Sequence, residues 1–306
     1  MAHRCPYHIG LLLATGTGAH RIGKIDDRRL REVSGLVVSP SDPQRLWVIN
    51  DSGNAPRVHL LTGTGERLAS VELLNARNRD WEDLAVYRDE QGPMLVVGDV
   101  GDNGAVRPYV SLYFVREPVL EDGQNAAAVA VDRVVHLRYP NGPRDVEGLA
   151  IDEANGEVLL LSKRTTPPVL YAVPLAGESG SPREPIVARV IGPVATIPPP
   201  SPQDLARDPV FGIYASQPTA LDYRADVGLL VLTYARPYLF LRRGAPTLAA
   251  SLDAAPIALE MPRLQQAEAA AFDAHATSVI VTSEKLPAPL LRLPFAEEFR
   301  RNSERE

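Results

Sequence analysis

Polar and apolar positions follow one short pattern that recurs five times along the chain. Each copy consists of a small polar or acidic residue, one further residue, a small apolar residue and then an apolar, strand-like run. The copies begin at five lead residues: Ser34, Glu82, Glu147, Thr219 and Glu268. Strand-built repeats about 50 to 70 residues apart are typical of propellers, in which similar sheets close into a ring. The pattern therefore predicts an all-β fold, a five-bladed β-propeller whose innermost strands begin at the lead residues.

A second apolar strand follows every lead residue and ends in polar residues. These five strands are Leu46–Ile49, Met94–Val97, Leu159–Leu161, Leu229–Leu232 and Val279–Val281. Turn sequences such as Asn155-Gly156 separate first and second strands, so each pair has the pattern of a hairpin. Third strands follow in most repeats, and the fourth strands are weaker.

The segments that flank the repeats complete the expected domain. His20–Ile25 is strand-like and precedes the first repeat, whereas the last repeat ends after three strands, near Pro294. We expect His20–Ile25 to pair with the last blade and close the ring, which leaves no open sheet edge. Residues 20–295 are then a single domain, with an N-terminal arm at 1–19 and a charged tail at 296–306.

One long insertion interrupts the repeats. Glu178–Ser216 is rich in proline, and long connections of this kind are often functional. We expect the insertion to run from the third blade to the fourth and to cover one mouth of the channel as a lid. One helical turn is expected within it, at Gln203–Arg207.

Composition and charge narrow the classes of function. A hydrophobic content of 45% supports a large core, and 28 prolines and 22 glycines suit many turns. The formal net charge of −6 argues against binding to nucleic acid, because no basic excess is present to displace counterions. No apolar run approaches the roughly 20 residues of a membrane span. We therefore expect a small-molecule partner, no nucleic acid, no membrane, and a monomer.

The N-terminal residues leave the localisation open. Cys5 is the only cysteine, which excludes a disulfide framework and a cysteine zinc site. Residues 1–19 combine Arg4, a Leu11–Leu13 run and small residues up to Ala19, as in a short secretory signal. The alternative is an extended arm, so a cytoplasmic and a secreted protein both fit the sequence.

The five lead residues are the first candidates for chemistry, because a five-fold ring brings them together. All are hard oxygen donors, without imidazole or thiolate among them. Such donors favour Ca²⁺, whose remaining ligands are waters. Three glutamates around a narrow channel repel one another and take up protons unless a cation is bound. The alternative role is structural: the lead residues cap strand starts by bonding backbone amides.

Charged residues at the ends of the second strands reach the same face of the ring. Asp51 and Asp99 are candidate general bases that activate a metal-bound water. The candidate binding residues for an anionic substrate are Lys163, Arg164, Arg236 and Lys285. The alternative for the aspartates, and for Asp102, is a role in turns, where Asp and Gly often occur together.

Four phrases resemble a widespread, largely uncharacterised family of bacterial propeller proteins. They are Asn50-Asp51-Ser52-Gly53, Asp80-Trp81-Glu82-Asp83-Leu84-Ala85, Gly98-Asp99-Val100-Gly101-Asp102-Asn103 and Asp145-Val146-Glu147-Gly148-Leu149. The resemblance covers residues 20–295, and its most specific phrase is Gly-Asp-x-Gly-Asp-Asn. Members of this family are often secreted.

More distantly, the ring resembles that of the calcium-activated nucleotidases (apyrases), five-bladed propellers with a central Ca²⁺. Their ring order of Ser, Glu, Glu, Ser and Glu corresponds here to Ser34, Glu82, Glu147, Thr219 and Glu268. The resemblance therefore implies a calcium site. Lys163-Arg164 falls where these enzymes carry a basic pair, and Asp51 where they carry an acid. The Gly-Asp-x-Gly-Asp-Asn loop and the region of Arg236 depart from the pattern of the nucleotidases. The resemblance therefore gives little support for nucleotide hydrolysis by this protein.

These observations lead to one hypothesis with two alternatives. The leading hypothesis is a Ca²⁺-dependent hydrolase acting on an anionic small molecule, such as a phosphorylated one. Asp51 or Asp99 takes a proton from water, and Lys163, Arg164 and Arg236 bind negative charge. The first alternative is a lyase, epimerase or cyclase that uses Ca²⁺ as a Lewis acid. The second is a non-catalytic binding or scaffold propeller whose central ion is structural.

Overall fold

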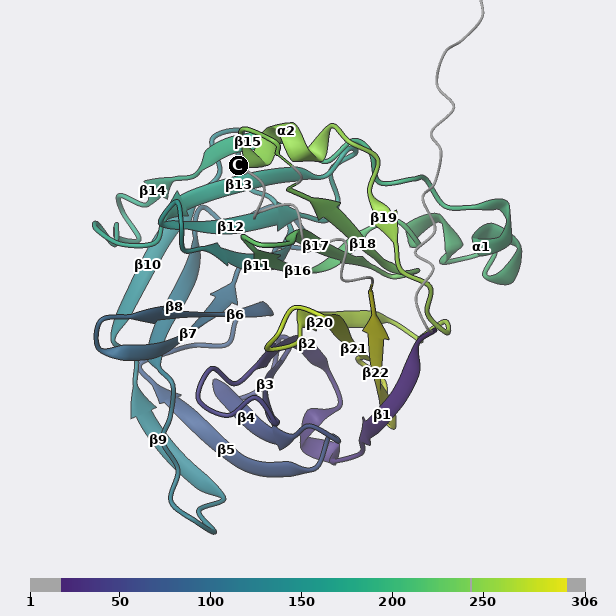
Figure 1. Ribbon diagram of the computed structural model, residues 1–306. Coiled ribbons are helices and arrows are strands. Elements are labelled where there is room, and N and C mark those ends of the chain that lie inside the picture. The colour runs from purple at the N-terminus through teal and green to yellow at the C-terminus, as the bar shows by residue number, and fades with distance from the viewer. Residues whose placement is uncertain (1–17, 243, 296–306) are drawn as a thin grey trace, which may run out of the picture.

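The computed structural model describes residues 18–242 and 244–295, which form five sheets arranged in a ring (Figure 1). The innermost strands are β2 (Val33–Val38), β6 (Trp81–Asp89), β11 (Val146–Asp152), β16 (Pro218–Arg224) and β20 (Ala267–Phe272). Each contains one lead residue, and each contacts the innermost strands of both neighbouring blades. The all-β, five-bladed propeller predicted from the repeats is therefore confirmed. The proposed arm and tail lie almost wholly outside the described residues.

Each blade continues outward from its innermost strand. Blade 1 adds β3 (Arg45–Asn50), β4 (Arg57–Thr62), β5 (Arg67–Leu74) and β9 (Ala126–Ala130). Blade 2 adds β7 (Gly92–Asp99), β8 (Val110–Arg116), β10 (Arg133–Arg138) and β14 (Ile186–Val187). Blade 3 adds β12 (Glu157–Ser162), β13 (Val169–Pro174) and β15 (Arg189–Pro193), and blade 4 adds β17 (Gly228–Thr233), β18 (Pro237–Leu241) and β19 (Ile257–Ala258). Blade 5 adds β21 (Ser278–Ser283), β22 (Ala288–Pro294) and β1 (His20–Ile25).

The first strand in the chain closes the ring, as the sequence predicts. β1 pairs antiparallel with β22, from His20 opposite Arg292 to Ile25 opposite Ala288. It thereby becomes the outermost strand of the last blade, while a short 3-10 helix at Arg28–Leu30 leads directly into β2 of the first blade. The last blade is thus built from both ends of the described chain.

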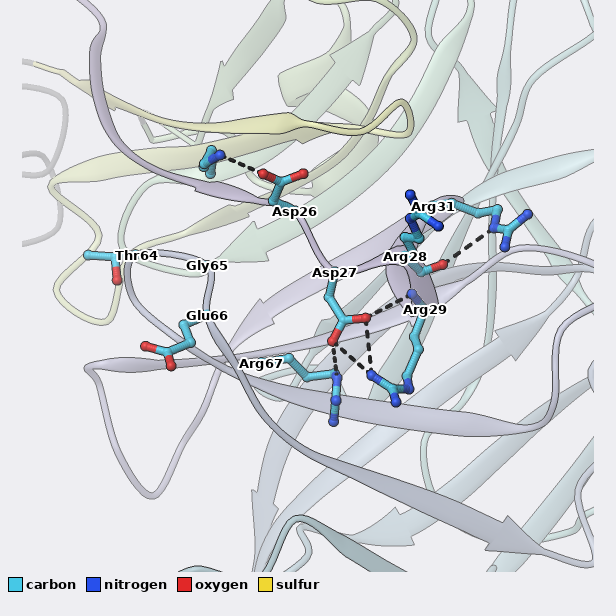
Figure 2. Close-up of a pocket in the computed structure, with 10 residues that line it drawn as sticks. Asp26, Asp27, Arg28, Arg29, Arg31, Thr64, Gly65, Glu66 and Arg67 are labelled. Carbon is cyan, nitrogen blue, oxygen red and sulfur yellow. Dashed lines mark hydrogen bonds and ion pairs between the residues drawn. The ribbon is translucent and has the colours of Figure 1, made fainter.

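A cluster of charged residues ties this closing segment to blade 1 (Figure 2). Asp27 accepts hydrogen bonds from the Arg67 side chain at 2.6 Å and from the Arg29 backbone at 2.9 Å. An open hollow of about 980 Å³ lies beside these residues. None of its lining residues belongs to the acidic cluster described below. We therefore assign this region to ring closure rather than to chemistry.

The apolar residues are buried between neighbouring blades. In the described part of the chain, each of five buried hydrophobic clusters combines residues of two adjacent blades. In one of them Trp47 of blade 1 joins Trp81 and Leu95 of blade 2. Because a single blade cannot bury its own faces, the ring is one structural unit.

The ladder between first and second strands slips at the lead residue in every blade. In blade 1, Val33 pairs with Asn50 and Gly35 with Ile49, so Ser34 has no partner in the ladder. The same slip occurs at the other four lead residues. Bulges of this kind redirect side chains and are frequent next to active sites. Five equivalent bulges therefore present the lead residues at one end of the ring.

The insertion Glu178–Ser216 differs from the simple connection that the sequence predicts. Its first part adds β14 to blade 2 and β15 to blade 3, where its backbone groups pair with strands whose edge is otherwise open. Its second part contains α1 (Pro202–Arg207), at the predicted helical turn, and a 3-10 turn at Gly212–Tyr214. The described helices, including α2 (Leu248–Leu252), are all too short to cross a membrane.

Candidate metal centre

Carboxylates from three parts of the chain meet at the lead-residue end of the ring. Carboxylate oxygens of Asp51, Asp80 and Glu82 lie within 4.8 Å of one another, and so do those of Glu82, Asp145 and Glu147. Glu82 belongs to both groups, and Glu82 and Glu147 are only 5% and 3% exposed. We call these five residues the acidic cluster. Such a set of oxygen donors is suited to a hard divalent cation such as Ca²⁺.

The sequence prediction omitted Asp80 and Asp145, although a signal for them exists. Each lies two positions before a lead glutamate. The same position in the other repeats carries Glu32, Gln217 and Gln266, so all five repeats have an acid or an amide there. Asp80 and Asp145 directly precede β6 and β11, the strands that carry the lead glutamates. The repeat therefore marks a second tier of polar side chains next to the lead residues.

The two hydroxyl residues of the predicted ring tie neighbouring blades together. Ser34 Oγ donates to the Trp81 carbonyl and Thr219 Oγ1 donates to the Ala267 carbonyl, each at 2.8 Å. Each bond links one innermost strand to the next, which agrees with a structural role, although the partners are carbonyls rather than amides. A hydroxyl oxygen that donates its proton keeps lone pairs for a cation. The metal-binding role of Ser34 and Thr219 therefore stays a prediction.

Burial and mutual repulsion raise the pKa values of the acidic cluster. Burial is the main cause for Glu82, whose pKa is raised well above its usual value, with further contributions from Glu147, Asp51 and Asp80. Burial also raises the pKa of Asp80 to about 6 and that of Glu147 to about 7. A bound cation would favour the ionised form of each of these groups, whereas burial and mutual repulsion favour the protonated form in its absence.

Lys163, which directly follows β12, supplies a positive charge to this region. Its ammonium donates to Glu147 at 2.8 Å and lies 5.0 Å from the centre of the Tyr234 ring. Burial alone lowers the pKa of Lys163, but Glu147 and Glu268 outweigh burial, so the pKa is raised and the side chain is charged. Burial raises the pKa of Glu268 to about 8 despite Lys163. The predicted substrate-binding residue thus neutralises carboxylates of the ring.

The other part of the acidic cluster has no such counter-ion. Within residues 18–242 and 244–295, no lysine or arginine forms an ion pair with Asp51, Asp80 or Glu82. Asp145, in contrast, pairs with Arg164 at 2.6 Å. The unbalanced negative charge is therefore concentrated around Glu82, and a cation fits there best.

The Gly-Asp-x-Gly-Asp-Asn loop forms a wall of the acidic cluster. A Cβ atom on Gly101 would lie 2.2 Å from Glu82 Oε1 and 2.6 Å from the Asp80 carboxyl, so only glycine leaves both carboxylates in place. Asp99 accepts a hydrogen bond from the Asp80 backbone at 3.0 Å and pairs with Arg107 at 2.9 Å. The loop thus fixes where the acids of the cluster lie.

Two further residues of this loop connect it to blade 3. The Asp102 carboxylate accepts from the backbones of Val106 and Arg107, which confirms its turn role. The Asp102 backbone donates to Asp145 at 2.9 Å, and Asn103 accepts from the Arg164 side chain. Asp145 is therefore held in the cluster by a neighbouring blade and by a neighbouring arginine.

The remaining predicted site residues are not all gathered at the cluster. Asp51 lies in the cluster and has a pKa raised by burial, with Glu32 adding to the shift. Asp99 is engaged by Arg107. Arg236 lies 3.8 Å from Asp204 of α1, and Lys285 lies 3.1 Å from Glu284. Neither Arg236 nor Lys285 lines the cavity described next, and their substrate-binding roles stay predictions.

A cavity of about 720 Å³ adjoins the lysine side of this region. It is lined by the cationic residues Lys163, Arg164 and Arg263, by the second-tier residues Gln217 and Gln266, and by Asp208, Phe211, Tyr214, Ala215, Tyr234, Ala235, Leu264 and Gln265. Residues 208–215 come from the second part of the insertion, which therefore contributes to the cavity wall. The expected role of the insertion as a lid over one mouth of the channel stays a prediction.

Comparison with known proteins yields structural neighbours but no family. No family model matches the chain, and no curated protein matches it. The chain is similar to a gluconolactonase from Xanthomonas campestris, with 13% identity, coverage of 86% of this chain and 72% of that chain, and a TM-score of 0.45. It is also similar to a luciferin-regenerating enzyme, with 10% identity, coverage of 91% and 95%, and a TM-score of 0.46. At this level the likeness concerns the fold alone. The resemblances to bacterial propellers and to nucleotidases stay predictions.

Proposed function

We propose that this protein is a Ca²⁺-dependent propeller enzyme that hydrolyses an anionic small molecule. The observation that carries the proposal is the negative charge around Glu82, which has no ion-pair partner among the described residues. This charge lies close to a cavity lined by Lys163 and Arg164. Lys163 connects the two features, since it bonds Glu147 and also lines the cavity.

The carboxylates of Asp80 and Glu82 are the principal candidates to hold the ion, and a carboxylate oxygen of Glu147 lies near Glu82. They offer hard oxygen atoms, and Ca²⁺ accepts six to eight oxygens, some of them from water. Gly101 leaves the space that Asp80 and Glu82 need. When bound, the ion would polarise a substrate oxygen and acidify a water molecule.

The other groups of the chain bind the substrate and move the proton. Lys163 and Arg164 attract its negative charge, and the aromatic and aliphatic lining, such as Phe211 and Leu264, accepts an apolar portion. Asp51 accepts the proton of the attacking water. Its raised pKa makes it a better base near neutrality than an ordinary aspartate. Asp99 is the weaker candidate for the general base because its carboxylate already forms an ion pair with Arg107.

A specific observation favours a second candidate, a non-catalytic binding propeller with a structural ion. All four predicted substrate-binding cations, Lys163, Arg164, Arg236 and Lys285, form ion pairs within the chain. A cation that already has a carboxylate partner attracts an external anion less strongly. The lyase, epimerase or cyclase alternatives have no observation of their own to favour them.

Metal content and melting temperature test the ion site. Wild-type protein purified with Ca²⁺ should contain bound calcium and melt at a higher temperature in Ca²⁺ than in chelator. Glu82→Gln should lose both properties. Glu66→Gln, which alters an exposed acid at the ring-closing seam, is the matched control and should keep both. Absence of calcium and of any shift in the wild type would contradict the site.

Activity separates the two candidate functions. A panel of phosphorylated small molecules is assayed for phosphate release with and without Ca²⁺, using wild type and Glu147→Gln. We expect Ca²⁺-dependent release that Glu147→Gln loses. Equal phosphate release by wild type and Glu147→Gln would contradict the proposed mechanism. Bound calcium without turnover of any anionic compound would favour the binding propeller.

A further inference from the structure

A small pocket next to blades 2 and 3 carries chemistry that the proposed function does not use. Its volume is about 120 Å³, and its lining comes from the start of β8, the end of β10 and the connection into β11. Three of its ten lining residues are arginines, namely Arg107, Arg138 and Arg144, and none is an aspartate or glutamate. The lining itself therefore carries positive charge alone, although Asp102 and Asp145 lie close enough to Tyr139 to raise its pKa.

Two buried donors of this pocket are without partners. Tyr139 Oη and Arg107 Nε form no hydrogen bond within the described structure, and these residues are only 3% and 6% exposed. Buried polar groups are nearly always hydrogen-bonded, and each exception requires an explanation. Both residues line the pocket, so an acceptor bound inside it could serve these atoms.

The positive charge of the pocket is only partly neutralised. Arg107 pairs with Asp99 at 2.9 Å. Among the described residues, Arg144 donates hydrogen bonds only to the backbone carbonyls of Pro143 and Asn141, at 2.7 and 2.8 Å. Neither Arg144 nor Arg138 has a carboxylate partner in residues 18–242 and 244–295. Two guanidinium charges therefore lack a counter-ion here.

We propose that this pocket binds a small inorganic oxyanion of the phosphate or sulfate class. Such an anion has several acceptor oxygens, which match the donors of arginine and tyrosine, and its charge balances the unpaired guanidinium groups. Water molecules can satisfy Tyr139 and Arg107 as acceptors, but they bring no charge. The volume admits a compact anion rather than a bulky organic ligand.

Binding at this pocket would reinforce the loop that shapes the acidic cluster. Arg107 donates to the Gly101 carbonyl at 2.6 Å and pairs with Asp99, and Gly101 approaches Glu82 closely. An anion that holds Arg107 in place therefore also stabilises this wall. The proposal does not depend on the hydrolase function, because it rests on a separate set of residues.

Thermal unfolding in chelator tests the proposal, since no metal can then recruit the anion to the acidic cluster. Melting temperature is measured against inorganic phosphate and sulfate, with sodium chloride at matched ionic strength. We expect a saturable increase with phosphate, sulfate or both, beyond that of chloride. Tyr139→Phe removes only the unpartnered hydroxyl, so the anion-free protein should keep its stability. Its oxyanion affinity should fall by about tenfold.

Arg144→Gln should weaken oxyanion binding by a similar factor. Two matched controls should bind as the wild type does: Tyr87→Phe and Arg88→Gln, whose parent residues lie outside the pocket. Within the part of the chain that the structure describes, the side chain of Arg88, like that of Arg144, bonds to backbone carbonyl oxygen and to no side chain. No increase beyond that of chloride would overturn the proposal. An equal increase in wild type, Tyr139→Phe and Arg144→Gln would also overturn it.

Discussion

The ammonium of Lys163 lies 2.8 Å from the carboxylate of Glu147, and both side chains are buried at the lead-residue end of the ring. This pair divides the ring of acids into two parts. Glu147 forms an ion pair with Lys163, whereas Asp51, Asp80 and Glu82 form no ion pair among the described residues. A ring that is nearly symmetric in sequence is therefore asymmetric in charge, and the asymmetry indicates where an ion belongs.

Lys163→Met should destabilise the protein strongly. The substitution leaves Glu147 without its buried partner, and breaking a buried ion pair from one side costs about 3–5 kcal/mol. The free energy of unfolding in urea, measured in chelator at pH 8, checks this. Lys285→Met is the matched control, because Lys285 is 47% exposed and its pair with Glu284 should contribute less than about 1 kcal/mol. Equal effects of the two variants would refute the role assigned to Lys163.

Metal-free protein should lose stability as the pH rises from 6.5 to 8.5. The pKa values of Glu147 and Glu268 are raised to about 7 and about 8 from 4.5. In this range the folded state retains protons that the unfolded state has released, so stability falls with rising pH. His59, whose pKa is lowered to about 4 by burial, has the opposite effect, but only below about pH 6.5.

Urea unfolding midpoints across this pH range measure the effect. Glu268→Gln should flatten the profile, because the amide does not titrate. Ca²⁺ should also flatten it, since a bound cation stabilises the ionised form. A wild-type profile in chelator that stays level, or that rises between pH 6.5 and 8.5, would show that these acids are not protonated in the folded state.

Gly101→Ala should weaken calcium binding while the fold persists. The new methyl group would overlap Glu82 Oε1 and the Asp80 carboxyl, which are ends of side chains and can move aside. Displaced ligands should lower the affinity for the ion by about 10–100-fold, as changes next to metal ligands do. Calcium titration followed by calorimetry measures the affinity. Gly104→Ala, in the same loop with no atom nearer than 3.7 Å, should leave it unchanged.

Phe211→Ser should raise KM for a substrate with an apolar portion while kcat stays similar. Phe211 lines the cavity but is remote from the proposed chemistry, so it contributes equally to substrate and transition-state binding. Loss of this contact should raise KM by about tenfold. Steady-state kinetics on the substrate found by the screen checks this. Val119→Ser is the control, because Val119 is 95% exposed and lies outside the cavity lining. A fall in kcat without a change in KM would contradict this role.

Much of the fold follows from local patterns. Apolar strand-like runs separated by turn sequences such as Asn155-Gly156 predict the hairpins, and the unpaired strand at His20–Ile25 predicts how the ring closes. The insertion Glu178–Ser216 was predicted less well. Its short strands β14 and β15 have little hydrophobic pattern of their own, and they exist because blades 2 and 3 offer open edges.

The candidate site was predicted in part. The five lead residues share one end of the ring because the repeat itself places them there. Asp80 and Asp145 also occupy a position that is acidic or amide in every repeat, but the prediction did not include them. The partners of the charged residues had no such signal. Asp99 meets Arg107, and Arg236 meets Asp204 of the insertion, through folding of irregular loops that follow no repeat.

The sequence by itself determined the five-fold repeat, the closing strand and the gathering of hard oxygen donors, because strand periodicity is a local property of the chain. Only the tertiary structure decided which charges are neutralised within the chain and which remain for a cation. Lys163 reaches Glu147, while Asp51, Asp80 and Glu82 converge without a counter-ion in the described residues. Electrostatic energy depends on distance and burial, and both are set by the packing of segments that lie far apart in the sequence.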